Sequence, residues 1–277
     1  MKNNWIVASL AYSALVLITT LLANLTRNTS FIALSQITPL IIVLMLLMLL
    51  PGRKETLRAS GMGKIGNMKW YGVAVLSGIP IILSFLVAWL LGFVSLPTAE
   101  YLNSGTAKFT VSEYIGYMTK MAWSPQMLIT MGIFAFGEEI GWRGFLQPKL
   151  TEGMGVRKAI LITAAIWAMF HYPFYLNDYN QDGNLFVDIL LFTLMIFPLS
   201  VFMGWVRLKS GSLWPAVLIH TVINMTRSWL EQLFHTKTTG WSYVAGEAGI
   251  VTLVLWTVIA LLIWFTLPKP SLQSQQN

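Results

Sequence analysis

The chain has 277 residues, of which 56% are hydrophobic and only 10% are charged, and its mean hydropathy is +0.65. Soluble domains carry about 25% charged residues, so this composition excludes an ordinary soluble protein and indicates a membrane protein. The net charge is +7, but Lys and Arg stand in short gaps between apolar runs, where they orient helices, so we expect the lipid bilayer and no nucleic acid as a partner.

In chain order, the apolar runs predict an all-α, polytopic bundle of about eight transmembrane helices in one domain, residues 1–277. The runs cover approximately 5–24, 31–50, 71–95, 125–147, 159–175, 185–206, 213–230 and 248–267. Several approach the ~20 residues that cross a bilayer. The first run resembles the apolar part of a signal peptide, but it is long and no small-residue cleavage site follows, so we predict a retained helix.

The loop charges predict that both termini are cytoplasmic. With the N-terminus inside, most of the 18 Lys and Arg lie in cytoplasmic gaps, and the exceptions are Arg27, Lys108, Lys120, Arg227 and Lys237. This asymmetry is the one that the positive-inside rule requires. We therefore expect a multi-pass protein of the cell membrane.

Polar residues interrupt three of the runs. They are Glu138, Glu139 and Arg143 in the fourth run, His171 at the end of the fifth, and His220 and Asn224 in the seventh. A charged side chain deep in a bilayer costs at least ~2.5–3.5 kcal/mol, so such residues indicate a function. At 1.5 Å per residue they lie roughly 12–18 Å from the inner ends of their helices, which predicts one common level.

Helical spacing separates the roles of these residues. Glu139 and Arg143 lie about 40° apart around a helix and form a natural ion pair, whereas Glu138 lies about 140° from Arg143. His220 and Asn224 share a face by the same spacing. The set suggests a carboxylate that deprotonates a water molecule, with imidazole and amide groups that position the water and stabilise an oxyanion.

The order of these motifs resembles that of a known family. Glu138-Glu139-Ile140-Gly141-Trp142-Arg143, then His171 four residues after an aromatic residue, then His220 with Asn224, is similar to the CPBP (Abi) family of CAAX proteases and bacteriocin-processing enzymes. The similarity covers residues 125–230, the motif-bearing core. Trp167 stands where the family commonly has Phe.

The resemblance implies an intramembrane glutamic endopeptidase that needs no cofactor. Glu138 would be the general base that activates water with His171, His220 and Asn224 would stabilise the oxyanion, and Glu139 and Arg143 would support them. The substrates would be membrane-associated peptides or lipidated protein tails, of CAAX type or like bacteriocins and signal peptides.

Other chemistries are less well supported by the sequence. Zinc remains a minority possibility because two Glu and two His could be ligands, but there is no HExxH motif and no cysteine, which also excludes a thiol nucleophile. Only Asp188 lies within a run, so an aspartyl dyad is missing. Residues 178–183 match the start of a calcium loop, but Ile189 stands where a carboxylate ligand is required.

Two functions from other classes remain open. A non-catalytic membrane protein could confer bacteriocin immunity or act as a scaffold through the same cavity. A transporter with a proton-coupled carboxylate pair is weaker, because the sequence shows no inverted repeat.

Overall fold

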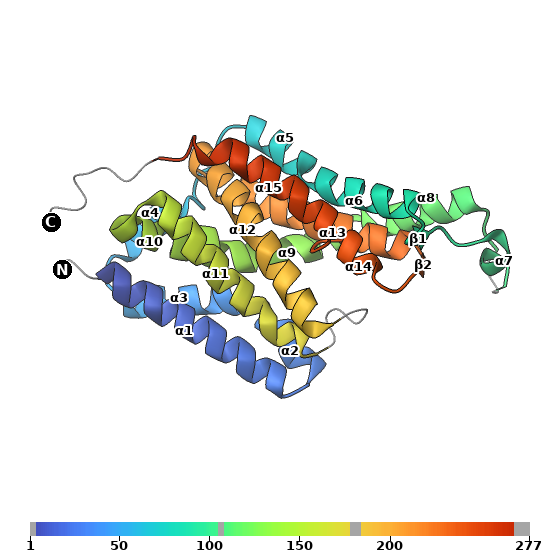
Figure 1. Ribbon diagram of the computed structural model, residues 1–277. Helices are drawn as coiled ribbons and strands as arrows, with labels where there is room; N and C mark the ends of the chain where they lie inside the picture. Colours follow the sequence, from blue (N-terminus) through green and yellow to red (C-terminus); the bar gives the residue numbers. More distant parts are fainter. Residues whose placement is uncertain (1–3, 105–107, 178–183, 269–277) are drawn as a thin grey trace.

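The computed structural model describes residues 4–104, 108–177 and 184–268, and it confirms the predicted all-α membrane bundle (Figure 1). The calcium-like segment 178–183 lies outside the described residues. The principal helices are α1 (Asn4–Leu25), α2 (Thr29–Ser35), α3 (Thr38–Leu49), α5 (Lys69–Val75), α6 (Ile79–Leu90), α9 (Pro125–Gly141), α11 (Val156–Tyr175), α12 (Leu185–Ser210), α13 (Trp214–Leu233) and α15 (Ile250–Trp264). A 3₁₀ turn, η1 (Leu76–Gly78), joins α5 to α6.

The shorter elements connect or flank these helices. They are α4 (Arg53–Ser60), α7 (Ala99–Leu102), α8 (Val111–Ala122), α10 (Gln147–Met154), α14 (Trp241–Val244) and the antiparallel strands β1 (Val94–Ser95) and β2 (Thr236–Lys237). The predicted run 71–95 is therefore too long at its end. Gly92 has a positive φ of 79° directly after α6, which ends the helix, and the chain then forms β1.

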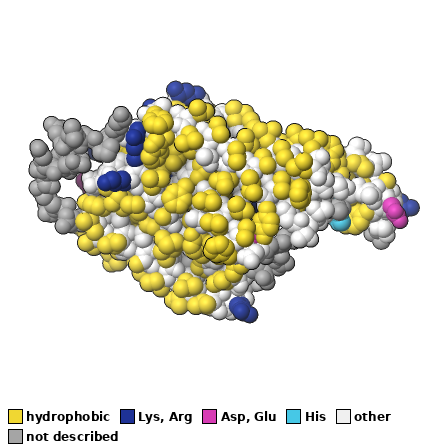
Figure 2. Space-filling view, in the orientation of Figure 1, with side chains coloured by type: hydrophobic (Ala, Val, Ile, Leu, Met, Phe, Trp, Pro, Cys, Tyr) yellow, Lys and Arg dark blue, Asp and Glu magenta, His cyan; other side chains and the backbone are white. Residues whose placement is uncertain are grey.

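The surface of the bundle is largely apolar. Within the described residues, α1, the α5–α6 unit and α12 are long and apolar enough to cross a membrane, and the bent pair α2–α3 passes as a fourth span. Leu90, Leu262 and Phe265 are more than 70% exposed. In Figure 2 apolar side chains cover most of the visible face, as they do where a surface contacts lipid.

Helix α9 lies at the centre, packed between α3 and α13, while α11 packs against α1 and α12. The start of α1 and the end of α15 lie at the same end of the bundle. There Arg157 at the start of α11 donates to the carbonyls of Trp264 and Leu267 at 3.2 and 3.1 Å. The indole of Trp5 in α1 packs over Gly153 in α10 at the same end.

The second predicted helix, 31–50, is broken into α2 and α3, which are bent by 57°. Pro39 in the first turn of α3 starts a new helix, and the hydroxyl of Thr38 donates to the carbonyl of Ser35 at 2.8 Å. Asn24 of α1 donates to the Ser35 hydroxyl at 3.4 Å and so ties the bend to α1. The bend moves α2 away from the axis of α3.

The fourth predicted helix, 125–147, extends further than expected. After Gly141 the chain winds as a π-helical segment, η2 (Trp142–Leu146), and continues into α10. Such insertions are often found at functional sites because they rotate the following side chains. Here η2 carries Trp142 and Arg143, which contact the two carboxylates of α9.

We predict that Gly141→Ala destabilises the protein by about 1–3 kcal/mol, because overpacking a filled interior forces side chains to move. A Cβ atom at Gly141 would overlap the hydroxyl of Tyr12 and lie 2.6 Å from Cβ of Pro39. Gly132→Ala in the same helix is the matched control, since nothing lies within 4 Å of its Cβ position. Thermal unfolding in detergent compares the two variants, and equal melting temperatures would contradict the prediction.

Candidate active site

A cavity of about 400 Å³ opens between α2, α9, α11 and α13. Glu138, His171, His220 and Asn224, which come from three helices, all line it. Its remaining lining is mixed. Aromatic and apolar side chains come mainly from α9 and α11, and polar or charged side chains come from Gln36, Arg227, Ser228, Glu231 and Glu247. A water molecule takes about 30 Å³ in the liquid, so the cavity has room for water and for part of a substrate.

Two indole groups hold the carboxylate of Glu138. Oε2 accepts hydrogen bonds from Nε1 of Trp167 at 2.9 Å and from Nε1 of Trp142 at 3.2 Å. Oε1 accepts none from the described residues, and the side chain is 6% exposed at the cavity wall. One oxygen is therefore fixed by neutral donors, while the other is available to a molecule in the cavity.

Glu139 points about 100° away from Glu138 around α9 and is completely buried, as is Arg143. Nη1 of Arg143 donates to Oε1 of Glu139 at 2.9 Å, the i,i+4 ion pair expected from the spacing. Nη2 of Arg143 donates to the hydroxyl of Ser200 in α12 at 3.2 Å, and the guanidinium lies 4.2 Å from the ring centre of Trp167. This pair connects α9, η2, α11 and α12.

The two histidines are oriented by different partners. Nδ1 of His171 lies 2.9 Å from the carbonyl oxygen of Trp167, and because a carbonyl only accepts, Nδ1 carries the proton. Nδ1 of His220 lies 3.0 Å from Oε1 of Glu139. In both rings Nε2 makes no hydrogen bond with the described residues and can contact a molecule in the cavity.

Asn224 follows His220 by one turn on α13 and borders the cavity. Its side-chain amide makes no hydrogen bond with the residues that the structure describes. Further along α13, Arg227 pairs with Glu247 at 3.2 Å and lies 4.0 Å from Glu231. The cavity is thus lined by an amide and, further along α13, by a charged cluster.

Four residues support the site in roles that the sequence did not predict, although two of them, Trp142 and Trp167, stand in its motifs. They are Trp142, Trp167, Ser200 and Tyr12, whose ring packs edge-on against Trp142 with centroids 5.7 Å apart. The two tryptophans carried a signal, since Trp142 follows Glu138 by four residues and Trp167 precedes His171 by four. Ser200 and Tyr12 are brought in by α12 and α1, and nothing in their local sequence marks them.

Across residues 4–104, 108–177 and 184–268, no three His, Asp or Glu side chains are arranged to hold a metal ion. Glu139, a conceivable ligand, is already engaged by Arg143 and His220 through one oxygen.

Two comparisons with known proteins agree with this site. A family model described as type II CAAX prenyl endopeptidase Rce1-like matches residues 120–226, which contain all the motif residues. A CAAX prenyl protease 2 of Methanococcus maripaludis is 26% identical over 138 residues, covering 48% of this chain and 48% of the relative. The match therefore spans about half the length of that curated relative.

The matched segment runs from the end of α8 to α13 and includes α9, η2, α11 and α12, the elements that enclose the motif residues. The sequence predicted the same family from three motifs, and the comparisons confirm it. Over residues 120–226 this chain is thus similar to the Rce1-like CAAX prenyl endopeptidases.

Proposed function

We propose that this protein is a multi-pass endopeptidase of the cell membrane that hydrolyses peptide bonds with water activated by Glu138. The observation that carries the proposal is the position of Glu138. It lines a cavity large enough for water, and two indoles fix one of its oxygens. Two histidines and one amide line the same cavity.

In the proposed reaction, a water molecule binds between Oε1 of Glu138 and Nε2 of His171. Glu138 takes a proton from the water as the oxygen attacks the carbonyl carbon of the scissile peptide bond. The carbonyl oxygen becomes negatively charged, and protonated Nε2 of His220 and the amide of Asn224 donate hydrogen bonds to it. Glu138 then gives the proton to the departing amine nitrogen as the C–N bond breaks.

Glu139 and Arg143 act as positioning residues. The carboxylate of Glu139 holds Nδ1 of His220 and stabilises a positive charge on that ring. Arg143 neutralises Glu139 and packs on Trp167, whose indole orients Glu138. Neither residue lines the cavity, which supports a role through their neighbours.

We propose membrane-associated proteins with CAAX-type tails, or comparable membrane peptides, as substrates. The family match and the CAAX prenyl protease relative support the first class. The aromatic side chains of the cavity, Phe134, Phe170 and Phe174, and the lipid-facing bundle around it suit a peptide that reaches the site from the bilayer.

Glu138→Gln should lower the cleavage rate by at least about 10²-fold, because a general base contributes 10²–10⁴-fold and an amide cannot take the proton. Cleavage of a prenylated, fluorescence-labelled CAAX peptide in proteoliposomes measures the rate. Glu152→Gln, a change at an exposed carboxylate of α10, is the control. A Glu138→Gln variant with unchanged melting temperature and full activity would remove the proposal.

Arg143→Met should destabilise the protein by about 3–5 kcal/mol, because it leaves the buried carboxylate of Glu139 without its cation. The equivalent change in the exposed pair, Lys149→Met, should cost less than about 1 kcal/mol. Replacing both partners, as in Glu139→Gln with Arg143→Met, should recover part of the loss. Denaturant or thermal unfolding in detergent tests this, and no recovery in the double variant would count against the ion-pair explanation.

Metal-independent hydrolysis is also part of the proposal, supported by the engagement of Glu139 with Arg143 and His220. Treating the purified protein with EDTA and 1,10-phenanthroline should leave peptide cleavage within about twofold of the untreated rate, as expected when a carboxylate supplies the base. Loss of activity on chelation that zinc restores would show instead that a bound ion activates the water.

A further inference from the structure

The two ends of the bundle differ in charge. In Figure 1, α4 and α10 lie at the end where α1 begins, and α14 and β2 lie at the opposite end. Most of the described Lys and Arg belong to the first end, and they are Arg53, Lys54, Arg58, Lys64, Lys69, Lys149, Arg157, Lys158, Arg207 and Lys209. Apart from the buried Arg143, the other described ones are Arg27, Lys108, Lys120, Arg227 and Lys237.

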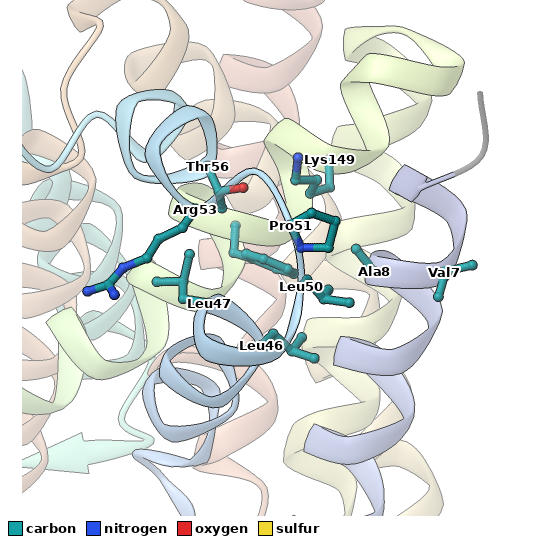
Figure 3. Close-up of a pocket in the computed structure, with 10 residues that line it drawn as sticks. Val7, Ala8, Leu46, Leu47, Leu50, Pro51, Arg53, Thr56 and Lys149 are labelled. Atoms are coloured by element: carbon teal, nitrogen blue, oxygen red, sulfur yellow. The ribbon is translucent and has the colours of Figure 1, made fainter. Parts of the chain in front are cut away.

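Contacts hold the basic segments together at the first end. Nη2 of Arg207, in the last turn of α12, donates to the carbonyl of Ala59 in α4 at 2.6 Å. Figure 3 shows Arg53 of α4 and Lys149 of α10 near the start of α1. Loops rich in Lys and Arg stay on the cytoplasmic side of a membrane, so this is the cytoplasmic end of the bundle.

The cavity of the candidate active site extends away from the cytoplasmic end. Helix α13 begins there with Trp214, whose Nε1 donates to the carbonyl of Met62 at 2.9 Å. Cavity-lining residues then follow on one face of the helix, in the order His220, Asn224, Arg227 and Glu231. At 1.5 Å per residue, Glu231 lies roughly 25 Å along the helix from Trp214.

Side-chain exposure increases in the same direction. On α13 the side chain of His220 is 8% exposed, that of Arg227 is 25% exposed and that of Glu231 is 33% exposed. Helix α9 leads into η2 and α10 at the cytoplasmic end, so its earlier residues lie further from that end. Its cavity-lining residues Phe134 and Met131 are half-buried, whereas Glu138 is buried.

Packed side chains fill the space on the cytoplasmic side of Glu138. All five residues of η2, Trp142–Leu146, are buried, as are Gln147 and Leu150 of α10. Phe170 and Phe174 are also buried and close the cavity wall along α11. The cavity is therefore open between α2, α9 and α13, toward the end of the bundle that lies opposite the basic loops.

This open part of the cavity faces water. Arg227 and Glu231 line it with partly exposed side chains, and Glu247, which pairs with Arg227, is 16% exposed. Ionisable side chains within a membrane bundle face one another or a water-filled cavity, because hydrocarbon solvates charge poorly. A lipid-facing groove would not carry three such groups.

We infer that the cavity opens on the extracytoplasmic side of the membrane, and that substrates present the bond to be cut from that side. This inference rests on the proposed function and decides between the two substrate classes named there. It selects membrane peptides whose cleaved segment has crossed the bilayer, such as exported peptides. A lipidated tail held in the cytoplasm would lie at the closed end of the site.

Labelling of single cysteines tests the orientation, because the chain contains no cysteine of its own. Ser228→Cys places a thiol on the cavity wall. In intact cells that express the full-length protein, it should react with a charged maleimide as fully as after permeabilisation, since a charged reagent does not cross the bilayer. The matched control is Lys209→Cys, at an exposed position of the cytoplasmic end, which should react only after permeabilisation.

Each other labelling result would overturn the inference. Reaction of Ser228→Cys only after permeabilisation would place the cavity on the cytoplasmic side. A thiol that reacts only in the denatured protein would show that the cavity does not open to water. Reaction of Lys209→Cys in intact cells would reverse the assignment of the two ends. Glu231→Cys, at the more exposed position on the same face, serves if Ser228→Cys does not fold.

A cleavage assay separates the orientation from the proposed function. A fluorescence-labelled membrane peptide with a charged, impermeant end should be cut when added to right-side-out vesicles, and should stay uncut with inverted vesicles until they are permeabilised. The reverse pattern would overturn the inference. Cleavage by neither preparation would contradict the proposed function, while the expected labelling would still support the orientation, because labelling requires no hydrolysis.

Discussion

Two adjacent carboxylates are buried in an apolar bundle, and the rest of the site is arranged around the need to stabilise them. An isolated ionised group in a medium of low dielectric constant is too costly to keep without partners. Glu139 is stabilised by the cation of Arg143 and by His220. Glu138 instead receives two neutral indole donors on one oxygen, so its charge is not neutralised and its second oxygen can act on a molecule in the cavity.

This difference between neighbouring residues explains why the site needs so many helices. Glu138 and Glu139 point about 100° apart around α9, so each needs partners of its own. Trp167 of α11 contacts the surroundings of both carboxylates. Its indole N–H donates to Glu138, and its ring packs against the guanidinium of Arg143, the partner of Glu139. Trp142 and Arg143 are consecutive residues of the π-helical segment η2. Trp142 donates a hydrogen bond to Glu138, and Arg143 donates one to Glu139.

The same arrangement links the site to the periphery of the bundle. Tyr12 of α1 packs on Trp142 and on Phe145, and Gly141 has no side chain because Tyr12 and Pro39 occupy that space. Helix α1 lies outside the segment that matches the family, yet it supports the donor of Glu138.

The sequence by itself determined the class of protein and its motif residues, because both depend on local properties. Long uncharged runs require helices in a bilayer, and i,i+4 spacing alone pairs Glu139 with Arg143 and aligns His220 with Asn224. Only the tertiary structure decided which residues complete the site. The bend between α2 and α3, the π-helical turn at Trp142, and the approach of Tyr12 and Ser200 depend on packing between distant segments, and neither hydropathy nor helical period records such contacts. The selection of Trp142 and Trp167 as donors to Glu138, rather than as lipid-facing aromatics, likewise required knowing which side of each helix meets α9.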